Sequence, residues 1–111
     1  MKKNILILSP HADDEILGCG GFISRYSKQN FHINVLIMTN ANKGAPEIFS
    51  SELIKQIRTE SKLANNSIGT KRLFFEDLPA LNLSNYPIYK IVNIINKYIA
   101  DINPEIVLIP S

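Results

Sequence analysis

Cysteine is almost absent from this chain of 111 residues, because Cys19 is the only one. An internal disulfide is therefore excluded, and nothing in the sequence points to an oxidising compartment. Cys19 lies in a segment whose apolar residues follow a helical period. We expect it to be a small buried apolar side chain rather than a catalytic thiol.

The chain also lacks a large excess of charge of either sign, since 12 basic and 10 acidic residues leave a formal net charge of +2. Lysine and arginine never occur more than two in a row, and acidic residues are interspersed among them. This pattern gives no support to a surface that binds nucleic acid or an anionic membrane.

Long apolar runs are missing as well. The first run, Ile5 to Leu8, continues directly into charged residues and has no small-residue cleavage site, unlike a signal peptide. No segment approaches the ~20 apolar residues of a membrane span. We therefore predict a soluble, cytoplasmic protein of one domain, because 111 residues are enough to bury a single core.

Four short β-type runs alternate with three segments of helical periodicity. The strands are predicted at residues 3–8, 33–39, 71–75 and 105–109. The helices are predicted at 16 to about 30, 51–68 and 87–102. This β-α-β-α-β-α-β order predicts an α/β fold, a Rossmann-like parallel sheet with helices on both faces. In the strand order 3-2-1-4, ligands bind where the winding reverses, at the carboxyl ends of the first and fourth strands.

The residues at that position are the most unusual in the chain. Ser9 to Gly21 has the sequence S-P-H-A-D-D-E-I-L-G-C-G-G, directly after the first apolar run. One imidazole and three carboxylates thus fall within five residues at the exit of a buried strand. Acids that merely complement the positive end of a helix explain one or two of these groups, but not the histidine. A divalent metal site, with zinc first among the candidates, explains the set better.

Residues of similar type take different roles in this hypothesis. His11 and Asp14, three apart around the turn, can point at one ion. Asp13 projects differently and can remain off the metal as a base for bound water. Glu15 is expected to be a helix-terminus residue or to support the ligands rather than to bind the ion itself.

Dinucleotide binding is the main rival for a first βα turn in this architecture. It needs a glycine-rich turn directly after the strand, where phosphates approach the helix N-terminus. Here that turn holds acids, which repel phosphate. The glycines Gly18, Gly20 and Gly21 come later, as G-x-G-G on the helix. We expect them to let the helix pack closely against the sheet or loops.

The segment P-H-A-D-D-E-I-L-G-C-G-G resembles the signature of the PIG-L/LmbE-like family of zinc-dependent de-N-acetylases, usually written P-H-P-D-D-E. Ala12 stands where that pattern has its second proline, which alters turn stiffness and leaves the three chemical side chains in place. The similarity also covers the strand ending in Thr39-Asn40, the helix with Arg58 and Glu60, the L-P-A-L loop and the strand ending I-V-L-I-P-S. It spans essentially the whole chain, although only the first motif is highly specific.

The resemblance implies a hydrolase that removes the acetyl group from an N-acetylated amino sugar or its conjugate. It implies His11 and Asp14 as ligands of Zn²⁺ or another divalent metal, and Asp13 as the general base for attack by a zinc-bound water. Hydrolysis of another amide, such as a thiol conjugate, would use the same metal chemistry.

Two residues are candidates for contact with the substrate. Family members carry a substrate-contacting arginine on the second helix, where Arg58 is the only arginine. A solvated helix arginine explains Arg58 equally well. Asn40, at the end of the second strand, faces the same rim and could touch sugar hydroxyls, although it could also simply begin a loop.

A catalytic zinc site normally has three protein ligands, and this sequence supplies two. His32 begins the second strand at its amino end, roughly 20 Å from the cluster. Asp77 is at the correct edge of the sheet but two strands away from the first. In the family the third ligand is a histidine just after the fourth strand. We therefore predict that residues 1–111 are the amino-terminal part of a longer deacetylase domain, truncated after strand four.

The alternative is a non-catalytic fragment or interaction module that keeps the fold but lacks the third ligand. In either case one flank of the sheet is expected to be uncovered. Such a flank invites pairing with another chain, which includes a second copy of this protein.

Overall fold

The computed structural model describes residues 3–12, 14–80 and 85–110. Within these residues, strands and α-helices alternate as predicted, and a short 3₁₀ helix, η1 (Ala41–Lys43), follows the second strand. The strands are β1 (Lys3–Ser9), β2 (Phe31–Asn40), β3 (Arg72–Pro79) and β4 (Ile106–Leu108). The helices are α1 (Asp14–Ser27), α2 (Ser51–Ile68) and α3 (Ile88–Ile102).

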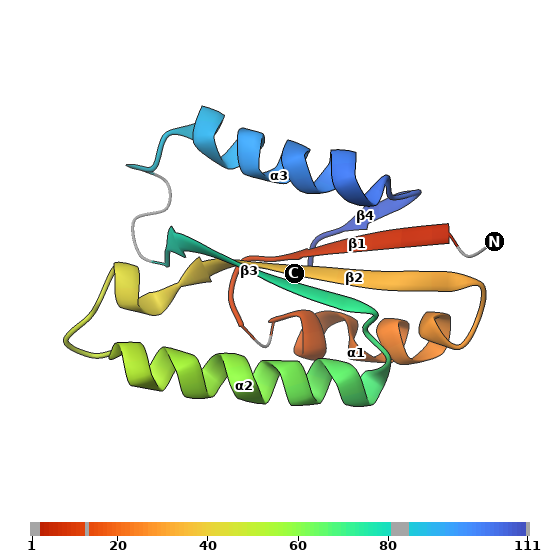
Figure 1. Ribbon diagram of the computed structural model, residues 1–111, viewed down its shortest axis with the longest axis horizontal. Helices are drawn as coiled ribbons and strands as arrows, with labels where there is room; N and C mark the ends of the chain where they lie inside the picture. Colours follow the sequence, from red (N-terminus) through yellow and green to blue (C-terminus); the bar gives the residue numbers. More distant parts are fainter. Residues whose placement is uncertain (1–2, 13, 81–84, 111) are drawn as a thin grey trace.

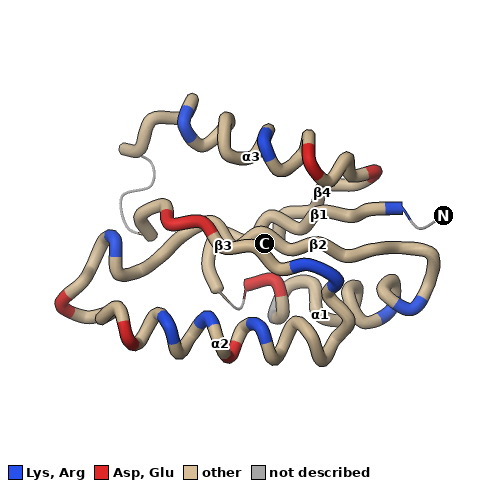
Figure 2. Tube along the Cα trace, in the orientation of Figure 1, with Lys and Arg blue, Asp and Glu red and all other residues tan. Residues whose placement is uncertain are grey.

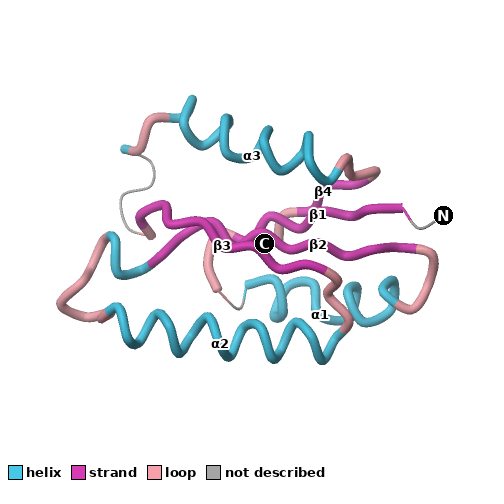
Figure 3. Tube along the Cα trace, in the orientation of Figure 1, coloured by secondary structure: helices cyan, strands magenta, loops and turns pink. Residues whose placement is uncertain are grey.

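The four strands form one parallel sheet in the order β3-β2-β1-β4. Helices α1 and α2 cover one face of this sheet, and α3 covers the other (Figure 1). Figure 3 shows the same layers by secondary structure, with the strands between the two sets of helices. The predicted Rossmann-like α/β fold and its strand order are confirmed.

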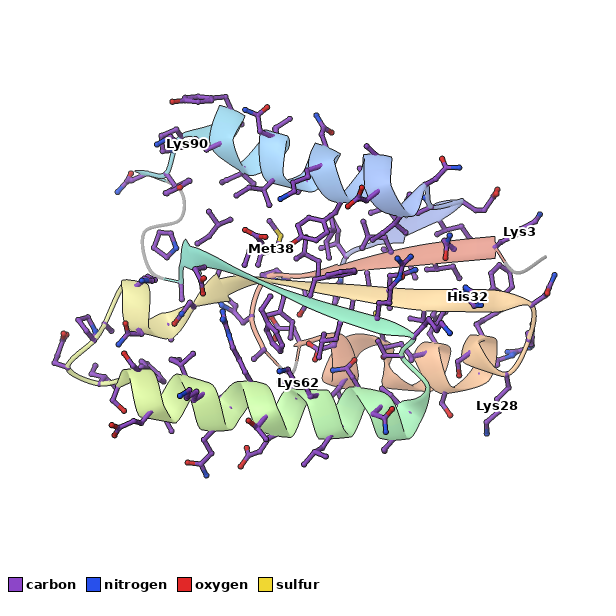
Figure 4. All side chains as sticks on the ribbon, in the orientation of Figure 1. Lys3, Lys28, His32, Met38, Lys62 and Lys90 are labelled. Atoms are coloured by element: carbon purple, nitrogen blue, oxygen red, sulfur yellow. The ribbon has the colours of Figure 1, made fainter. Side chains whose placement is uncertain are left out.

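The core consists of two apolar clusters, because successive side chains of a buried strand point to opposite faces of the sheet. The cluster on the α1 and α2 face is built on Ile5, Ile7, Ile23, Ile33, Val35 and Ile37. The cluster on the α3 face is built on Leu6, Leu8, Leu36, Met38, Leu78 and Ile102. Met38 is labelled between the sheet and α3 in Figure 4. Burial on both faces explains why β1 and β2 are near-continuous apolar runs.

The ends of α2 are set by local sequence signals. Ser50 caps the first turn, since its side-chain oxygen accepts a hydrogen bond of 3.1 Å from the Leu53 amide. Gly69 ends the helix in the left-handed conformation, with φ of 104°. A Cβ atom at Gly69 would lie 2.2 Å from the Ser27 hydroxyl oxygen, so glycine is required for close packing as well as for conformation.

Strand β3 is longer than predicted, because pairing continues past two charged residues through a β-bulge. Ile37 pairs with Phe75 and Thr39 pairs with Leu78, so Glu76 and Asp77 together oppose a single residue of β2. The sequence prediction ended the strand at Phe75, before both acids. The bulge instead accommodates both acids, and pairing between β2 and β3 continues beyond it at Leu78 and Pro79.

Strand β4 is shorter than predicted and lies at an edge of the sheet. Its side chains Ile106 and Val107 are 43% and 41% exposed. Among the residues that the structure describes, none pairs with the outer edge of β4, as expected for an uncovered flank, while its pairing with another chain stays a prediction.

The described part of the chain includes no helix that combines the length and apolar character needed to cross a membrane. Acidic and basic residues are interspersed along α2 rather than forming a surface of one sign (Figure 2). This arrangement agrees with the mixed charge pattern of the sequence.

Candidate active site

The turn that follows β1 carries His11 to the end of β2. Strands β1 and β2 are parallel and pair Ser9 with Ile37, so the residues two positions further along each chain reach the same level. His11 Nδ1 consequently lies 3.0 Å from the hydroxyl oxygen of Thr39. Thr39 in turn donates a hydrogen bond of 2.7 Å to the Pro10 carbonyl oxygen. The role of Thr39 was not predicted from the sequence.

The backbone of this turn is held from both sides. The Ser9 hydroxyl lies 2.7 Å from the His11 carbonyl oxygen and 3.0 Å from a Glu15 carboxylate oxygen, and its one hydrogen can be donated to either. The Asp14 amide donates to the His11 carbonyl oxygen at 3.3 Å. Asp14 is the first residue of α1 and is partly buried. His11 and Asp14 thus lie together at the carboxyl end of β1, as predicted. Asp13, the expected general base, lies outside the described residues.

Glu15 is fully buried, with 0% of its surface exposed. One carboxylate oxygen lies 3.0 Å from the Ser9 hydroxyl, and the other accepts a hydrogen bond of 3.0 Å from the Asn65 amide on α2. A buried carboxylate needs such donors, because it has left the water that would otherwise solvate it. Glu15 therefore joins α1 to α2 and to the end of β1, which agrees with the expected supporting role.

Asn65 has no counterpart in the sequence predictions, although one signal was present. Ser61 and Asn65, four residues apart on α2, are both buried, at 1% exposure each. The Ser61 hydroxyl has no hydrogen-bond partner among the described residues, so the network at this position is built by the Asn65 side chain. Asn65 donates to the Ser61 carbonyl and accepts from the Thr70 hydroxyl, so its amide is fully engaged.

Cys19 is half-buried beside the cluster on the α1 face. Burial raises the pKa of its thiol above the usual range, and the negative charge of Glu15 raises it further. A raised pKa keeps the sulfur protonated at neutral pH, whereas a nucleophilic cysteine needs the thiolate. The expectation of an apolar packing residue is supported.

A cavity of about 430 Å³ opens beside the turn. We call it the His11 cavity, and its lining residues are His11, Ala12, Thr39, Ala41, Ala45, Phe49, Ile57 and Ala80. Apart from His11 and Thr39, every side chain in this lining is apolar. The cavity can therefore receive an apolar group next to the imidazole.

Arg58 and Asn40, the predicted substrate contacts, meet at Asp77. Arg58 Nη2 donates to the Asp77 carboxylate at 2.8 Å and to the Glu76 carbonyl oxygen at 2.9 Å. Asn40 Nδ2 donates to the same Asp77 oxygen at 3.0 Å, and Asn40 Oδ1 caps η1 by accepting from the Asn42 amide. The hydrogen bond from Asn40 is the largest of the causes that lower the pKa of Asp77. Partial burial acts in the opposite direction, and the hydrogen bond and charge of Arg58 lower the pKa further.

These residues line a different cavity from His11. Asn40 and Arg58 border a separate polar cavity of about 220 Å³, whose lining includes Asn42 and Lys43 of η1. Their contact with a substrate therefore stays a prediction. Asp77, which was weighed as a third metal ligand, is engaged in the ion pair with Arg58 and lies on β3, with β2 between it and β1.

The side chains at the turn are of types that bind divalent metals. An imidazole and a carboxylate are ligand types that zinc accepts, and His11 is exposed at the rim of a cavity. No cluster of three or more histidine, cysteine, aspartate or glutamate side chains is formed within residues 3–12, 14–80 and 85–110. His32 lies at the amino end of the sheet (Figure 4), as expected from its place at the start of β2. The residue types of His11 and Asp14 suit a metal, and their roles as ligands stay predictions, as does the third ligand.

Comparison with known families decides the relationship. Residues 6–111 match the family described as PIG-L, GlcNAc-PI de-N-acetylase. The chain belongs to the PIG-L family. The predicted membership is thereby confirmed over nearly the whole sequence.

Individual relatives of this PIG-L member include deacetylases and one other enzyme. It is 36% identical to the uncharacterised deacetylase YaiS of Escherichia coli strain K12 over 47 residues. These residues make up 42% of this chain and 25% of YaiS. The N,N'-diacetylchitobiose deacetylase of Pyrococcus horikoshii has a TM-score of 0.80 and 22% identity, over 95% of this chain and 39% of that one.

The 4-carboxy-2-hydroxymuconate hydratase GalB of Pseudomonas putida KT2440 has a TM-score of 0.78 and 18% identity, over 95% of this chain and 45% of GalB. At such identities both solved structures share the fold alone. The PIG-L chain thus spans less than half the length of either structure and a quarter of YaiS.

Proposed function

We propose that the protein removes the acetyl group from an N-acetylated amino sugar or its conjugate, with zinc or another divalent metal as cofactor. The observation that carries this proposal is the family match over residues 6–111, combined with a histidine and an aspartate at the carboxyl end of β1. In a parallel α/β sheet that edge is where ligands bind.

In this proposal His11 and Asp14 hold the metal, and Asp13 moves the proton. When bound, the divalent cation supplies Lewis-acid and water-activating chemistry. The Asp13 carboxylate takes a proton from the attacking water and later donates it to the departing nitrogen, so that the products are acetate and a free amine. Both roles follow from the family resemblance of this turn.

The His11 cavity suits the acyl side of such a substrate. Its apolar wall, which includes Phe49, Ile57 and Ala80, would contact the acetyl methyl group next to the imidazole. The sugar hydroxyls need polar partners, and Asn40 and Arg58 remain the candidates on the neighbouring rim. Substrate would therefore bridge the apolar cavity and that polar rim.

Two other outcomes compete with this proposal. The fold also occurs in the hydratase GalB, so architecture alone does not select the reaction. The alternative weighed from the sequence is a non-catalytic module that keeps the fold. Neither alternative uses Asp13 to release acetate.

The test measures acetate released from a panel of N-acetylated amino sugars and glycosides, for this chain and for any longer product that its gene encodes. Asp13→Asn should reduce acetate release by at least ~10²-fold, the usual contribution of a general base. Zinc content measured on the same samples should be unchanged, because Asp13 is assigned no bond to the metal.

Glu47→Gln is the matched control, because Glu47 is an exposed acid in the loop that follows η1. It should leave acetate release unchanged. Acetate release that is insensitive to Asp13→Asn would refute the assigned base. Stoichiometric zinc without acetate release from any substrate in the panel would favour the non-catalytic alternative.

A further inference from the structure

The hydroxyl group of Thr39 determines which nitrogen of His11 carries a proton. A hydroxyl has a single hydrogen, and at Thr39 it points to the Pro10 carbonyl oxygen at 2.7 Å. That carbonyl can only accept. The contact of 3.0 Å between Thr39 Oγ1 and His11 Nδ1 must therefore be a hydrogen bond that the imidazole donates. The reverse assignment would leave two oxygens 2.7 Å apart without a proton between them.

A neutral imidazole carries one proton, so a proton on Nδ1 leaves Nε2 with its lone pair. We propose that Thr39 is a positioning residue that holds His11 in the Nδ1–H tautomer and thereby directs Nε2 to a divalent cation. The tautomer follows from the hydrogen bonds alone. The statement about the cation rests on the proposed function.

The surroundings make Thr39 suitable for this role. It is 6% exposed, so water competes little for its hydroxyl. Its β-branched side chain has restricted χ1 rotamers at the end of a paired strand. The Ser9 hydroxyl separately fixes the His11 backbone through the carbonyl oxygen. Ring and backbone of His11 are thus held by different strands, Thr39 on β2 and Ser9 on β1.

Nitrogen-15 NMR of the metal-free protein tests the tautomer directly. The chain has two histidines, and the variant His32→Gln assigns the spectrum. In its neutral form we expect the His11 imidazole to show a protonated Nδ1 and an unprotonated Nε2. A predominantly Nε2–H ring in the wild-type protein would overturn the proposal without any variant having to fold.

Zinc affinity tests the consequence for the cation. Thr39→Val keeps the shape and removes the hydroxyl, and we expect it to weaken zinc binding by roughly 10- to 100-fold and to release the tautomer preference. Thr39→Ser restores a hydroxyl and should bind within about threefold of wild type. Thr59→Val, an exposed threonine on α2, is the matched control and should change nothing.

The outcomes separate this inference from the proposed function. Wild-type protein with the Nδ1–H tautomer, combined with no zinc binding by this chain or by any longer product of its gene, would refute the metal assignment and retain the tautomer assignment. Zinc binding that is equal in wild type and Thr39→Val, with both folded by circular dichroism, would refute the role of Thr39 and retain the metal assignment.

Discussion

The side-chain amide of Asn65 donates a hydrogen bond to the carboxylate of Glu15 across fifty residues of sequence, at 3.0 Å and with both groups buried. This bond connects the last turn of α2 to the first turn of α1, the helix that begins at Asp14. The position of a candidate metal ligand therefore depends on a residue that lies far from it in the chain.

Replacement of Asn65 should consequently destabilise the protein. Asn65→Ala removes a donor to Glu15 and leaves a buried carboxylate oxygen unsatisfied, which costs about 1–3 kcal/mol. Urea denaturation followed by circular dichroism measures the loss. Asn66→Ala, one residue further along the same helix but exposed, should change stability by less than about 0.5 kcal/mol. Equal effects at the two positions would contradict the importance of the Glu15 bond.

The glycines of α1 should respond differently to alanine, although all were expected to permit close packing. A Cβ at Gly18 would lie 2.8 Å from the Pro110 Cβ, whereas Gly21 has no neighbouring atom within 4 Å. Gly18→Ala should therefore destabilise by about 1–3 kcal/mol through overpacking. Gly21→Ala should stabilise by about 0.5–1 kcal/mol, because alanine favours the helix. Thermal unfolding of both variants measures these changes in stability. A stabilised Gly18→Ala would show that Pro110 can shift to make room for the added methyl group without a net loss of stability.

The acid titration of Asp77 should depend on Asn40. The hydrogen bond from Asn40 is the largest of the causes that lower the Asp77 pKa, so Asn40→Ala should raise this pKa towards the ordinary aspartate value. A lowered pKa contributes stability above the unfolded-state value of about 3.9, and that stability is lost as pH falls through the folded-state pKa. Carbon-13 NMR of the Asp77 carboxyl measures the folded-state pKa of Asp77 in the wild type and in Asn40→Ala.

The variant Arg58→Met keeps an apolar stem on α2 and removes the charge that faces Asp77. It should raise the Asp77 pKa as well, and Asp77→Asn should remove this part of the acid dependence of stability. An Asp77 pKa that is identical in wild type and in both Asn40→Ala and Arg58→Met would contradict the described cluster.

The His11 cavity should affect turnover through Phe49, if the proposed function holds. Phe49→Ala removes part of the apolar wall, while the Phe49 backbone remains fixed by bonds to Ala45 and to the Asn42 side chain. Loss of an apolar contact worth about 1–2 kcal/mol lowers kcat/KM by about 5- to 30-fold. Phe49→Leu should lose much less. An unchanged kcat/KM in Phe49→Ala would mean that substrate does not use this wall.

Much of the fold was predictable because its signals are local. Apolar runs marked β1 and β2, Ser50 and Gly69 marked the ends of α2, and the alternation of elements predicted the parallel order. These features depend on neighbouring residues, or on rules that hold for any parallel sheet. The placement of His11 and Asp14 at the end of β1 followed from the same reasoning.

The rest depends on contacts between distant residues, which periodicity does not encode. The bulge at Glu76 and Asp77 arises from pairing with β2, and the burial of Glu15 arises from a donor on α2. The bond between Thr39 and His11 needs the register of β1 and β2, which no single segment specifies. The roles of His11, Asp13 and Asp14, the third ligand and the cytoplasmic location stay predictions.

The matched register of β1 and β2 limits how this sequence can vary in length. Thr39 reaches His11 because each lies two residues beyond the paired positions Ile37 and Ser9. An insertion or deletion of one residue within either interval would present a different side chain to the imidazole. Natural homologues, and any engineered tag or graft, should therefore tolerate added residues in the segment between η1 and α2 far better than between Ser9 and Asp14.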